Sequence, residues 1–288
     1  MPRVAPHTGE HAHRLRRWAS EAAFFDGLAT RLSVAAGPVP ELQIQRYLLQ
    51  PRPWYSKEFR FRWLGDLRGQ RVLDLGCGEG SNAILLAKAG AYVVGVDLSP
   101  ASIELCRARL SREGLAGRAE FHCSPLETFP LPEQSFDVLW GDGILHHLIE
   151  ELDTLLPRLA AAAKPGAKVV FAEPVAFSKW LRALRRHVPI HVDATPDERP
   201  LERVELSILA RHMPFLKSRS FLLFSRLARF VLRGNNYEIA SRPRRLATDA
   251  LFAVDYLLLS APGIDRLGGA RVFFGTTGPA PYPEVQTP

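Results

Sequence analysis

The sequence predicts an α/β fold in which a mainly parallel sheet carries helices on both faces. Short apolar segments of strand length alternate with segments of helical periodicity through the middle of the chain. A glycine-rich turn follows the first of these strands, and a carboxylate ends the second. Such strand–helix–strand units place neighbouring strands in parallel, so we expect a doubly wound sheet whose carboxyl ends meet at one edge.

The segment before the sheet is expected to be helical. Residues 1–13 are polar and basic, and we expect them to be a disordered tail. Apolar residues recur every three or four positions over residues 14–32, which predicts an amphipathic helix. Shorter helices are expected between residues 42 and 64. We therefore assign residues 14–66 to an N-terminal helical lid.

The core is expected to span residues 67–278. Strands are predicted near residues 71–75, 92–97, 119–122, 136–140 and 168–173, and helices near residues 81–89, 100–113, 145–149 and 152–163. Ligands of such sheets bind beyond the carboxyl ends of the strands. Asp74, Asp97, Gly141 and Glu173 fall at those ends, so we expect them to converge on one crevice.

The chain after Glu173 departs from simple alternation. A basic helix, a proline-rich loop and a further helix are expected in a first insertion, and two apolar helical segments in a second. The insertions span residues 174–215 and 226–266, and a loose proline-rich tail covers residues 279–288. Two more strands, near residues 221–224 and 271–275, flank the second insertion.

The most specific feature is the segment Val-Leu-Asp-Leu-Gly-Cys-Gly-Glu-Gly at residues 72–80. Glycines at alternate positions let backbone N–H groups and a helix N-terminus approach a polar ligand closely. Asp97 ends the next strand, nineteen residues after Gly78, where a carboxylate can bind both hydroxyls of a ribose. The glycine spacing differs from the dinucleotide pattern G-x-G-x-x-G. A cofactor that contains a ribose, other than a dinucleotide, is therefore indicated.

This segment resembles motif I of the class I S-adenosylmethionine-dependent methyltransferases, and Asp97 with its neighbours resembles their acidic motif. The resemblance continues through residues 135–139, 144–148 and 164–171 and covers about residues 68–175. It implies a Rossmann-like doubly wound sheet of seven strands with the last strand antiparallel, N-terminal helices and a helical insertion late in the chain. It also implies an enzyme that uses S-adenosyl-L-methionine and releases S-adenosyl-L-homocysteine.

The resemblance implies a set of cofactor-binding residues. They are Tyr55, Asp74, Gly76, Cys77, Gly78, Asp97, Leu98, Ser124, Leu126 and Gly141. Asp74 is expected near the amino group of the cofactor, and Leu98 against its adenine. The aspartate that relatives place after the third strand is replaced here by Pro125, so the adenine contact falls to Ser124, Leu126 or Glu127. Tyr55 is expected at the carboxylate end of the cofactor, with packing onto the sheet as the alternative.

The expected catalytic residues are His146, Asp142, Glu173 and His191. Adjacent histidines on a helix point about 100° apart, so only one of His146 and His147 can face the site. His146 is the candidate, either as a general base or as an orienting residue. Glu173 can accept a hydrogen bond from the acceptor, raise the pKa of a histidine, or cap a helix. His191 lies in a loop that would supply a base only if it closes over the site.

Composition limits the partners. The net charge of +7 comes from scattered arginines, which disfavours nucleic acid as a partner. Three cysteines without paired spacing indicate a cytoplasmic protein, and we find no cluster of metal-ligand spacing. Aromatic residues after the fifth strand favour a small, partly apolar metabolite as acceptor, with packing of the extra helices onto the sheet as the alternative. They are Phe215, Phe221, Phe224, Phe230, Tyr237, Phe252 and Tyr256. The alternatives are a lipid or quinone methyltransferase with peripheral membrane contact, and a module that binds the cofactor without transferring methyl groups. The oligomeric state is not predicted.

Overall fold

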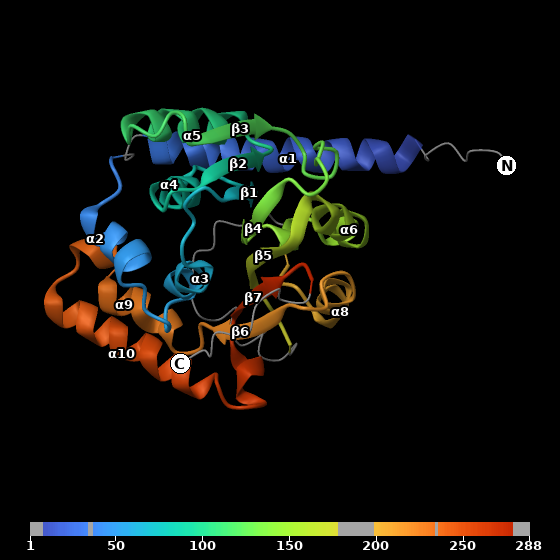
Figure 1. Cartoon of the computed structure of the whole chain (residues 1–288). Helices are drawn as coiled ribbons and strands as arrows, with labels where there is room; N and C mark the ends of the chain where they lie inside the picture. The colour runs from blue at the N-terminus through green and yellow to red at the C-terminus, as the bar shows by residue number, and fades with distance from the viewer. Residues whose placement is uncertain (1–7, 34–36, 178–198, 234–235, 279–288) are drawn as a thin grey trace.

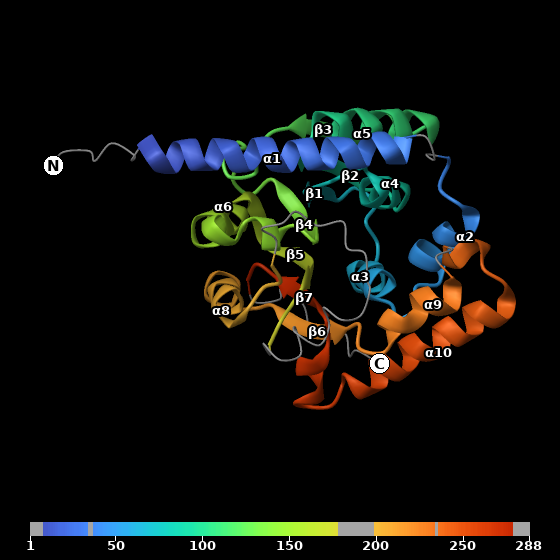
Figure 2. The same cartoon turned by 180° about the vertical axis from the view of Figure 1, so that it is seen from behind.

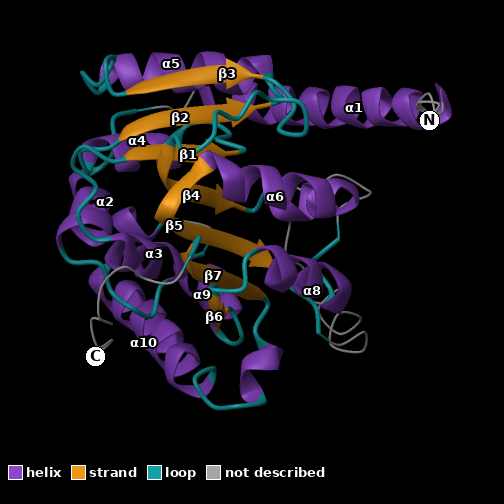
Figure 3. Ribbon diagram, turned by 45° about the vertical axis from the view of Figure 1, so that its right-hand side comes forward, coloured by secondary structure: helices purple, strands orange, loops and turns teal. Residues whose placement is uncertain are grey.

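A computed structural model describes residues 8–33, 37–177, 199–233 and 236–278. Its centre is a seven-stranded sheet with the order β3-β2-β1-β4-β5-β7-β6 (Figure 3). The strands are β1 (Arg71–Leu75), β2 (Tyr92–Asp97), β3 (Ala119–Cys123), β4 (Phe136–Asp142), β5 (Ala163–Pro174), β6 (Lys217–Phe221) and β7 (Ala270–Thr276). Only β7 runs antiparallel to its neighbours. The predicted seven-stranded doubly wound fold with an antiparallel last strand is confirmed.

Helices cover both faces of this sheet (Figure 1). They are α1 (Thr8–Ser33), α2 (Glu41–Ile44), α3 (Ser56–Leu64), α4 (Ser81–Lys88), α5 (Pro100–Arg112), α6 (Leu152–Ala162), α8 (Arg203–His212), α9 (Ala228–Leu232) and α10 (Arg242–Leu258). α6 and α8 lie on one face, and α3 and α4 lie on the other. None of the helices in these described ranges is long and apolar enough to cross a membrane.

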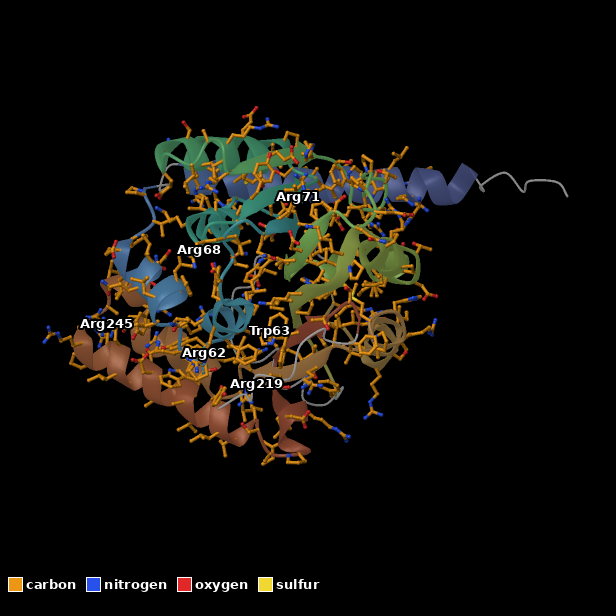
Figure 4. All side chains as sticks on the ribbon, in the orientation of Figure 1. Arg62, Trp63, Arg68, Arg71, Arg219 and Arg245 are labelled. Carbon is orange, nitrogen blue, oxygen red and sulfur yellow. The ribbon has the colours of Figure 1, made fainter. Side chains whose placement is uncertain are left out.

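The alternation of side chains along buried strands divides the core into two clusters. Leu73 of β1 and Leu139 of β4 face α6, whereas Val72 and Trp140 of the same strands face α3 and α4. Both faces are apolar because parallel strands are covered on both sides. Figure 4 labels Trp63 of α3, whose ring meets Phe274 of β7 with centroids 5.7 Å apart. This contact fixes α3 along the sheet.

Three expected boundaries are wrong. α1 begins at Thr8, so residues 8–13, expected to be disordered, are helical, and β5 begins at Ala163 rather than near residue 168. The strand expected over residues 221–224 ends at Phe221. Leu222 has a positive φ of 64°, which no strand residue adopts, and the next N–H groups turn toward Asp255. Residues 1–7 and 279–288 lie outside the described residues. The basic helix, expected over residues 177–187, also lies outside them except for Phe177.

Candidate functional site

The glycine turn after β1 forms the floor of the site. Gly76, Gly78 and Gly80 all have positive φ, between 51° and 84°. A Cβ atom on Gly76 would lie 2.5 Å from Cδ1 of Ile144, and one on Gly80 would lie 2.9 Å from Sγ of Cys106. A Cβ atom on Gly78 would meet nothing within 4 Å. The outer glycines are therefore required by packing, whereas Gly78 leaves open space for a ligand to approach the backbone.

Asp97 lies at the end of β2 and turns its carboxylate toward this floor. Its Oδ2 accepts the Gly78 N–H at 2.8 Å, and its Oδ1 accepts the Ser99 N–H at 2.9 Å. Burial raises the pKa of Asp97, although these backbone hydrogen bonds act in the opposite direction. A carboxylate held in this way is fixed in position beside the open backbone of Gly78.

Asp74 is the most unusual carboxylate of the site. It is 1 % exposed, and its Oδ2 has no hydrogen-bond partner among the described residues. Burial, followed by repulsion from Asp142 and Asp97, raises its pKa well above the ordinary value. A buried carboxylate without a partner is costly, so this position favours a cationic ligand group that would satisfy it.

Asp142 ends β4 and is held by groups that the sequence did not indicate. Arg60 of α3 forms an ion pair with it at 3.0 Å, and Asn82 donates to it at 3.0 Å. Burial raises the pKa of Asp142, but the neighbouring Arg60 and Lys57 outweigh that effect and the net pKa is lowered. Burial also lowers the pKa of Lys57, to about 8, against the attraction of Asp142 and Asp74. Two cations of α3 therefore balance the acids at the carboxyl edge.

Glu173 joins the end of β5 to the turn that follows β4. Its carboxylate accepts the backbone N–H groups of Ile144, Leu145 and His146 at 3.0, 2.8 and 3.3 Å. Its Oε2 also lies 2.9 Å from Nδ1 of His146. Glu173 therefore caps this turn, which is one of the roles considered for it, and it also orients the histidine. His146 lies near the glycine floor, because Ile144 of the same turn packs against Gly76.

α1 crosses the loops that follow the strands (Figure 2). Asp26 accepts the Ser99 hydroxyl at 2.5 Å and the Ala101 N–H at 3.0 Å. Trp18 donates to Glu127 at 2.9 Å after β3. Asp26 interrupts an apolar run in α1, and this was the one signal in the sequence that could have identified it. The expectation of a helical lid stays a prediction, with these contacts in its favour.

Five further residues expected to bind the cofactor lie at the ends of the strands or in the turns that follow them. Cys77 is 5 % exposed and Leu126 is 5 % exposed, and both belong to the apolar core. The backbone N–H of Ser124 donates to the backbone carbonyl of Asp97 at 2.9 Å. Gly141 lies against Ile144, where a Cβ atom would come within 2.9 Å. Leu98 follows directly after Asp97 at the end of β2 and is half-buried. Cys77 and Leu126 therefore turn their side chains into the core rather than into the crevice.

Tyr55 does not point into the crevice, contrary to our expectation. Its hydroxyl donates to Asp249 of α10 at 2.6 Å, and its ring stacks on Phe252 with centroids 4.2 Å apart. The alternative of packing is therefore favoured, although the partner is the late insertion rather than the sheet. Arg52, three residues before Tyr55, pairs with Glu58 and Asp249. His191 lies outside the described residues.

Two further expectations concerned metal ligands and the aromatic residues of the acceptor region. Within the described ranges, no group of three or more His, Cys, Asp or Glu residues could hold a metal ion. Of the aromatic residues expected in the acceptor region, Phe221 is buried against Phe59, whereas Phe215, Phe224 and Phe230 are about half exposed. Most of these rings therefore do not line a closed chamber.

Comparison with known proteins shows similarity over the core of the chain. Residues 72–166 match the family described as "Methyltransferase domain". Methyltransferase GfsG of Streptomyces halstedii is 34 % identical over 108 residues, which is 37 % of this chain and 38 % of that protein. A ubiquinone biosynthesis O-methyltransferase of Coxiella burnetii is 33 % identical over 106 residues, which is 37 % of this chain and 44 % of that protein. The chain thus spans less than half the length of these relatives.

Solved structures share the fold over most of the chain. Geranyl diphosphate C-methyltransferase from Streptomyces coelicolor A3(2), solved with S-adenosyl-L-homocysteine, matches with a TM-score of 0.55 and 16 % identity, covering 95 % of this chain and 100 % of the other. The [4+2]-cyclase SpnF matches with a TM-score of 0.54 and 21 % identity, covering 88 % of this chain and 94 % of the other. At these identities the likeness shows the fold alone.

Proposed function

We propose, from the premise that residues 72–166 form a class I methyltransferase domain, that this chain transfers a methyl group from S-adenosyl-L-methionine to a small, partly apolar metabolite. One observation carries the proposal. The unpartnered carboxylate oxygen of Asp74, the open backbone at Gly78 and the fixed carboxylate of Asp97 lie at one edge of the sheet. Relatives named as O-methyltransferases support the same reaction class.

The residues present fit this cofactor. Asp74 would accept the ammonium of the methionine end, which would satisfy its buried oxygen. Asp97 would hold the ribose hydroxyls, because its carboxylate is already aimed at the glycine turn. Gly78 would let the cofactor approach the backbone without a steric barrier. When bound, S-adenosyl-L-methionine supplies a methyl group on a positively charged sulfur, and S-adenosyl-L-homocysteine is the product that remains.

His146 would serve as the general base. Glu173 would accept a hydrogen bond from the Nδ1–H of this histidine. That bond would select the tautomer with the proton on Nδ1 and leave Nε2 able to take up a proton. Nε2 would take the proton that an O–H or N–H acceptor loses on methylation. Asp142, paired with Arg60, would stay ionised and help to orient the acceptor. The protein thus contributes position and proton removal.

The location that we propose is cytoplasmic. Cys77, Cys106 and Cys123 are free, which is typical of a reducing compartment.

The proposal is tested with the full chain in two steps. Calorimetric titration with S-adenosyl-L-homocysteine should show binding, and loss of that binding in Asp97→Asn would place it at this site. The protein is then incubated with methyl-labelled S-adenosyl-L-methionine and fractionated extracts of its source organism, and mass spectrometry identifies what gains the label. The absence of binding would overturn the proposal as a whole. Binding without any labelled product would instead favour a module that holds the cofactor without transfer.

A further inference from the structure

α10 exposes apolar residues on its outer side, although Phe252 and Tyr256 pack on its inner side. Its two buried residues are Thr248 and Asp255, both polar. Leu246, Leu257 and Val254 are 68 %, 71 % and 47 % exposed. These residues and Leu258, which we call the apolar stripe, recur at helical spacing and occupy one side of the helix. Figures 1 and 2 both show α10 at the outside of the molecule.

Polar contacts on the inner side fix the rotation of this helix. Asp255 accepts the backbone N–H groups of Leu223, Phe224 and Ser225 at 2.8 to 2.9 Å. One turn and a half earlier, Asp249 accepts hydrogen bonds from three side chains, among them Tyr55. Rolling α10 to bury its leucines would break both sets of charged hydrogen bonds. The exposure of the apolar stripe is therefore a stable property of the fold, and exposed apolar surface of this kind marks an interaction site.

The charges around the stripe are of one sign. Residues 224–258 contain six arginines and three acids. The acids turn inward, where Glu238 pairs with Arg46, Asp249 with Arg52, and Asp255 is 3 % exposed. The arginines Arg229, Arg233 and Arg242 are exposed, and Arg244 and Arg245 are half-buried. Figure 4 labels Arg245 at the outer end of α10. The surface beside the stripe is therefore cationic.

A cavity of about 360 Å³ opens at the same end of α10. Its lining includes Arg46, Arg52, Arg242, Arg245 and Leu246. Arg46 and Arg52 both form ion pairs with Glu58. Within the described part of the chain, neither Arg242 nor Arg245 has a carboxylate partner. Asp249 also lines this cavity, where it pairs with Arg52. Leu246 belongs to both the cavity and the apolar stripe, so a recess rich in arginine is continuous with an apolar surface.

We propose that this face docks on an anionic membrane surface. The apolar stripe would enter the boundary between headgroups and acyl chains, and Arg242, Arg244 and Arg245 would bind lipid phosphates. A second copy of the chain is a poorer occupant, because a symmetric dimer brings the same cationic rim to both sides of its interface. The inference goes beyond the proposed methyl transfer, since it concerns where the protein lies and not which acceptor it takes.

The test measures co-sedimentation of the full chain with vesicles of phosphatidylcholine, with and without phosphatidylserine. We expect binding to the vesicles that contain phosphatidylserine, weakened by salt. Replacing all three arginines in Arg242→Gln/Arg244→Gln/Arg245→Gln should weaken binding about 100-fold, at about fivefold for each arginine. Leu246→Asp/Leu257→Asp should weaken it at least as much, because both side chains would enter the apolar region.

Matched controls lie on α8, on the other face of the sheet. Val204 is 65 % exposed and the side chain of Arg211 is 61 % exposed, so Val204→Asp/Arg211→Gln changes similar surface elsewhere and should bind vesicles like the unmodified protein. Equal binding by the leucine variant, or no binding by the unmodified protein, would overturn the proposal. A dimer in ultracentrifugation that only the leucine variant dissociates would identify a second copy as the occupant instead. Titration with S-adenosyl-L-homocysteine should be unchanged in every variant, which separates this test from that of the methyl transfer.

Discussion

Replacing Asp97 by asparagine separates a cofactor-binding role from a structural one. The change keeps the size of the side chain and removes its charge. Asp97 accepts one N–H at each oxygen, from Gly78 at 2.8 Å and from Ser99 at 2.9 Å. An asparagine offers one acceptor and one amide N–H₂ group, so one backbone donor would face another donor. Both hydrogen bonds to the ribose would also lose their charged acceptor.

The structure sets the size of both effects. A hydrogen bond to a charged group is worth about 1.5 to 3 kcal/mol, so losing two such bonds to the ribose should cost about 3 to 6 kcal/mol. That cost corresponds to a weakening of roughly 10² to 10⁴ in the Kd for S-adenosyl-L-homocysteine. One unsatisfied backbone donor lowers the free energy of unfolding by about 1 to 3 kcal/mol. Removing a carboxylate whose pKa is raised by burial offsets part of that loss.

The assay pairs calorimetric titration with urea unfolding of the same preparations. Asp66→Asn is the control, because Asp66 is exposed and its side chain binds only its neighbour Arg68 among the described residues. We expect it to leave the Kd unchanged. If Asp97→Asn lowers the stability but leaves the Kd unchanged, then Asp97 is a structural acid and the assignment of the site is wrong. Affinity should also fall as the pH drops through the raised pKa of Asp97, since a protonated carboxyl is a weaker acceptor.

Three further variants test other parts of the site. Gly78→Val should abolish titration with S-adenosyl-L-homocysteine, because a β-branched side chain at φ 51° is strained by about 1 to 3 kcal/mol and would fill the open space. Glu173→Gln should lower the free energy of unfolding in urea by roughly 2 to 5 kcal/mol and shift the His146 ring away from its Nδ1–H tautomer in ¹⁵N NMR spectra. Lys57→Met should remove a rise in stability between about pH 8 and the ordinary lysine pKa of about 10.4, measured as urea midpoints.

Each of these expectations has a contrasting outcome. Gly114→Val is the control for Gly78, since Gly114 also has a positive φ, of 68°, and open space around it, and it should still bind. An unchanged NMR tautomer in Glu173→Gln would show that Glu173 does not orient the histidine. The sign for Lys57 follows from its lowered pKa: between the folded and unfolded pKa the unfolded chain holds more protons, so stability rises with pH by roughly 1 to 3 kcal/mol. A flat profile in the unmodified protein would contradict this.

The strand ends could be predicted because their signals are local. The apolar run of β1, its Asp74 and the glycine turn lie within residues 72–80. The apolar run of β2 and its Asp97 lie within residues 92–97. Arg60 was missed because its partner Asp142 lies 82 residues away. Tyr55 was assigned to the crevice because nothing near it in the sequence indicates Asp249, which is 194 residues away. Contacts between distant segments depend on how the helices pack, and periodicity alone does not report that.

α10 shows the same limit in a sharper form. The spacing of its apolar residues predicts a helix with two unlike sides, and the helix is present. Burial of the apolar side is the usual consequence of that pattern. Here the loop after β6 leaves three backbone N–H groups without strand partners, and Asp255 accepts them. Losing these three hydrogen bonds would cost about 1 to 3 kcal/mol each, against about 1.5 to 3 kcal/mol for each leucine turned inward. The same rotation would also break the hydrogen bonds that Asp249 accepts from Arg52, Tyr55 and Tyr237. The polar contacts of Asp255 with the irregular end of β6 and those of Asp249 together oppose that rotation, and so keep exposed the surface that we propose to meet the membrane.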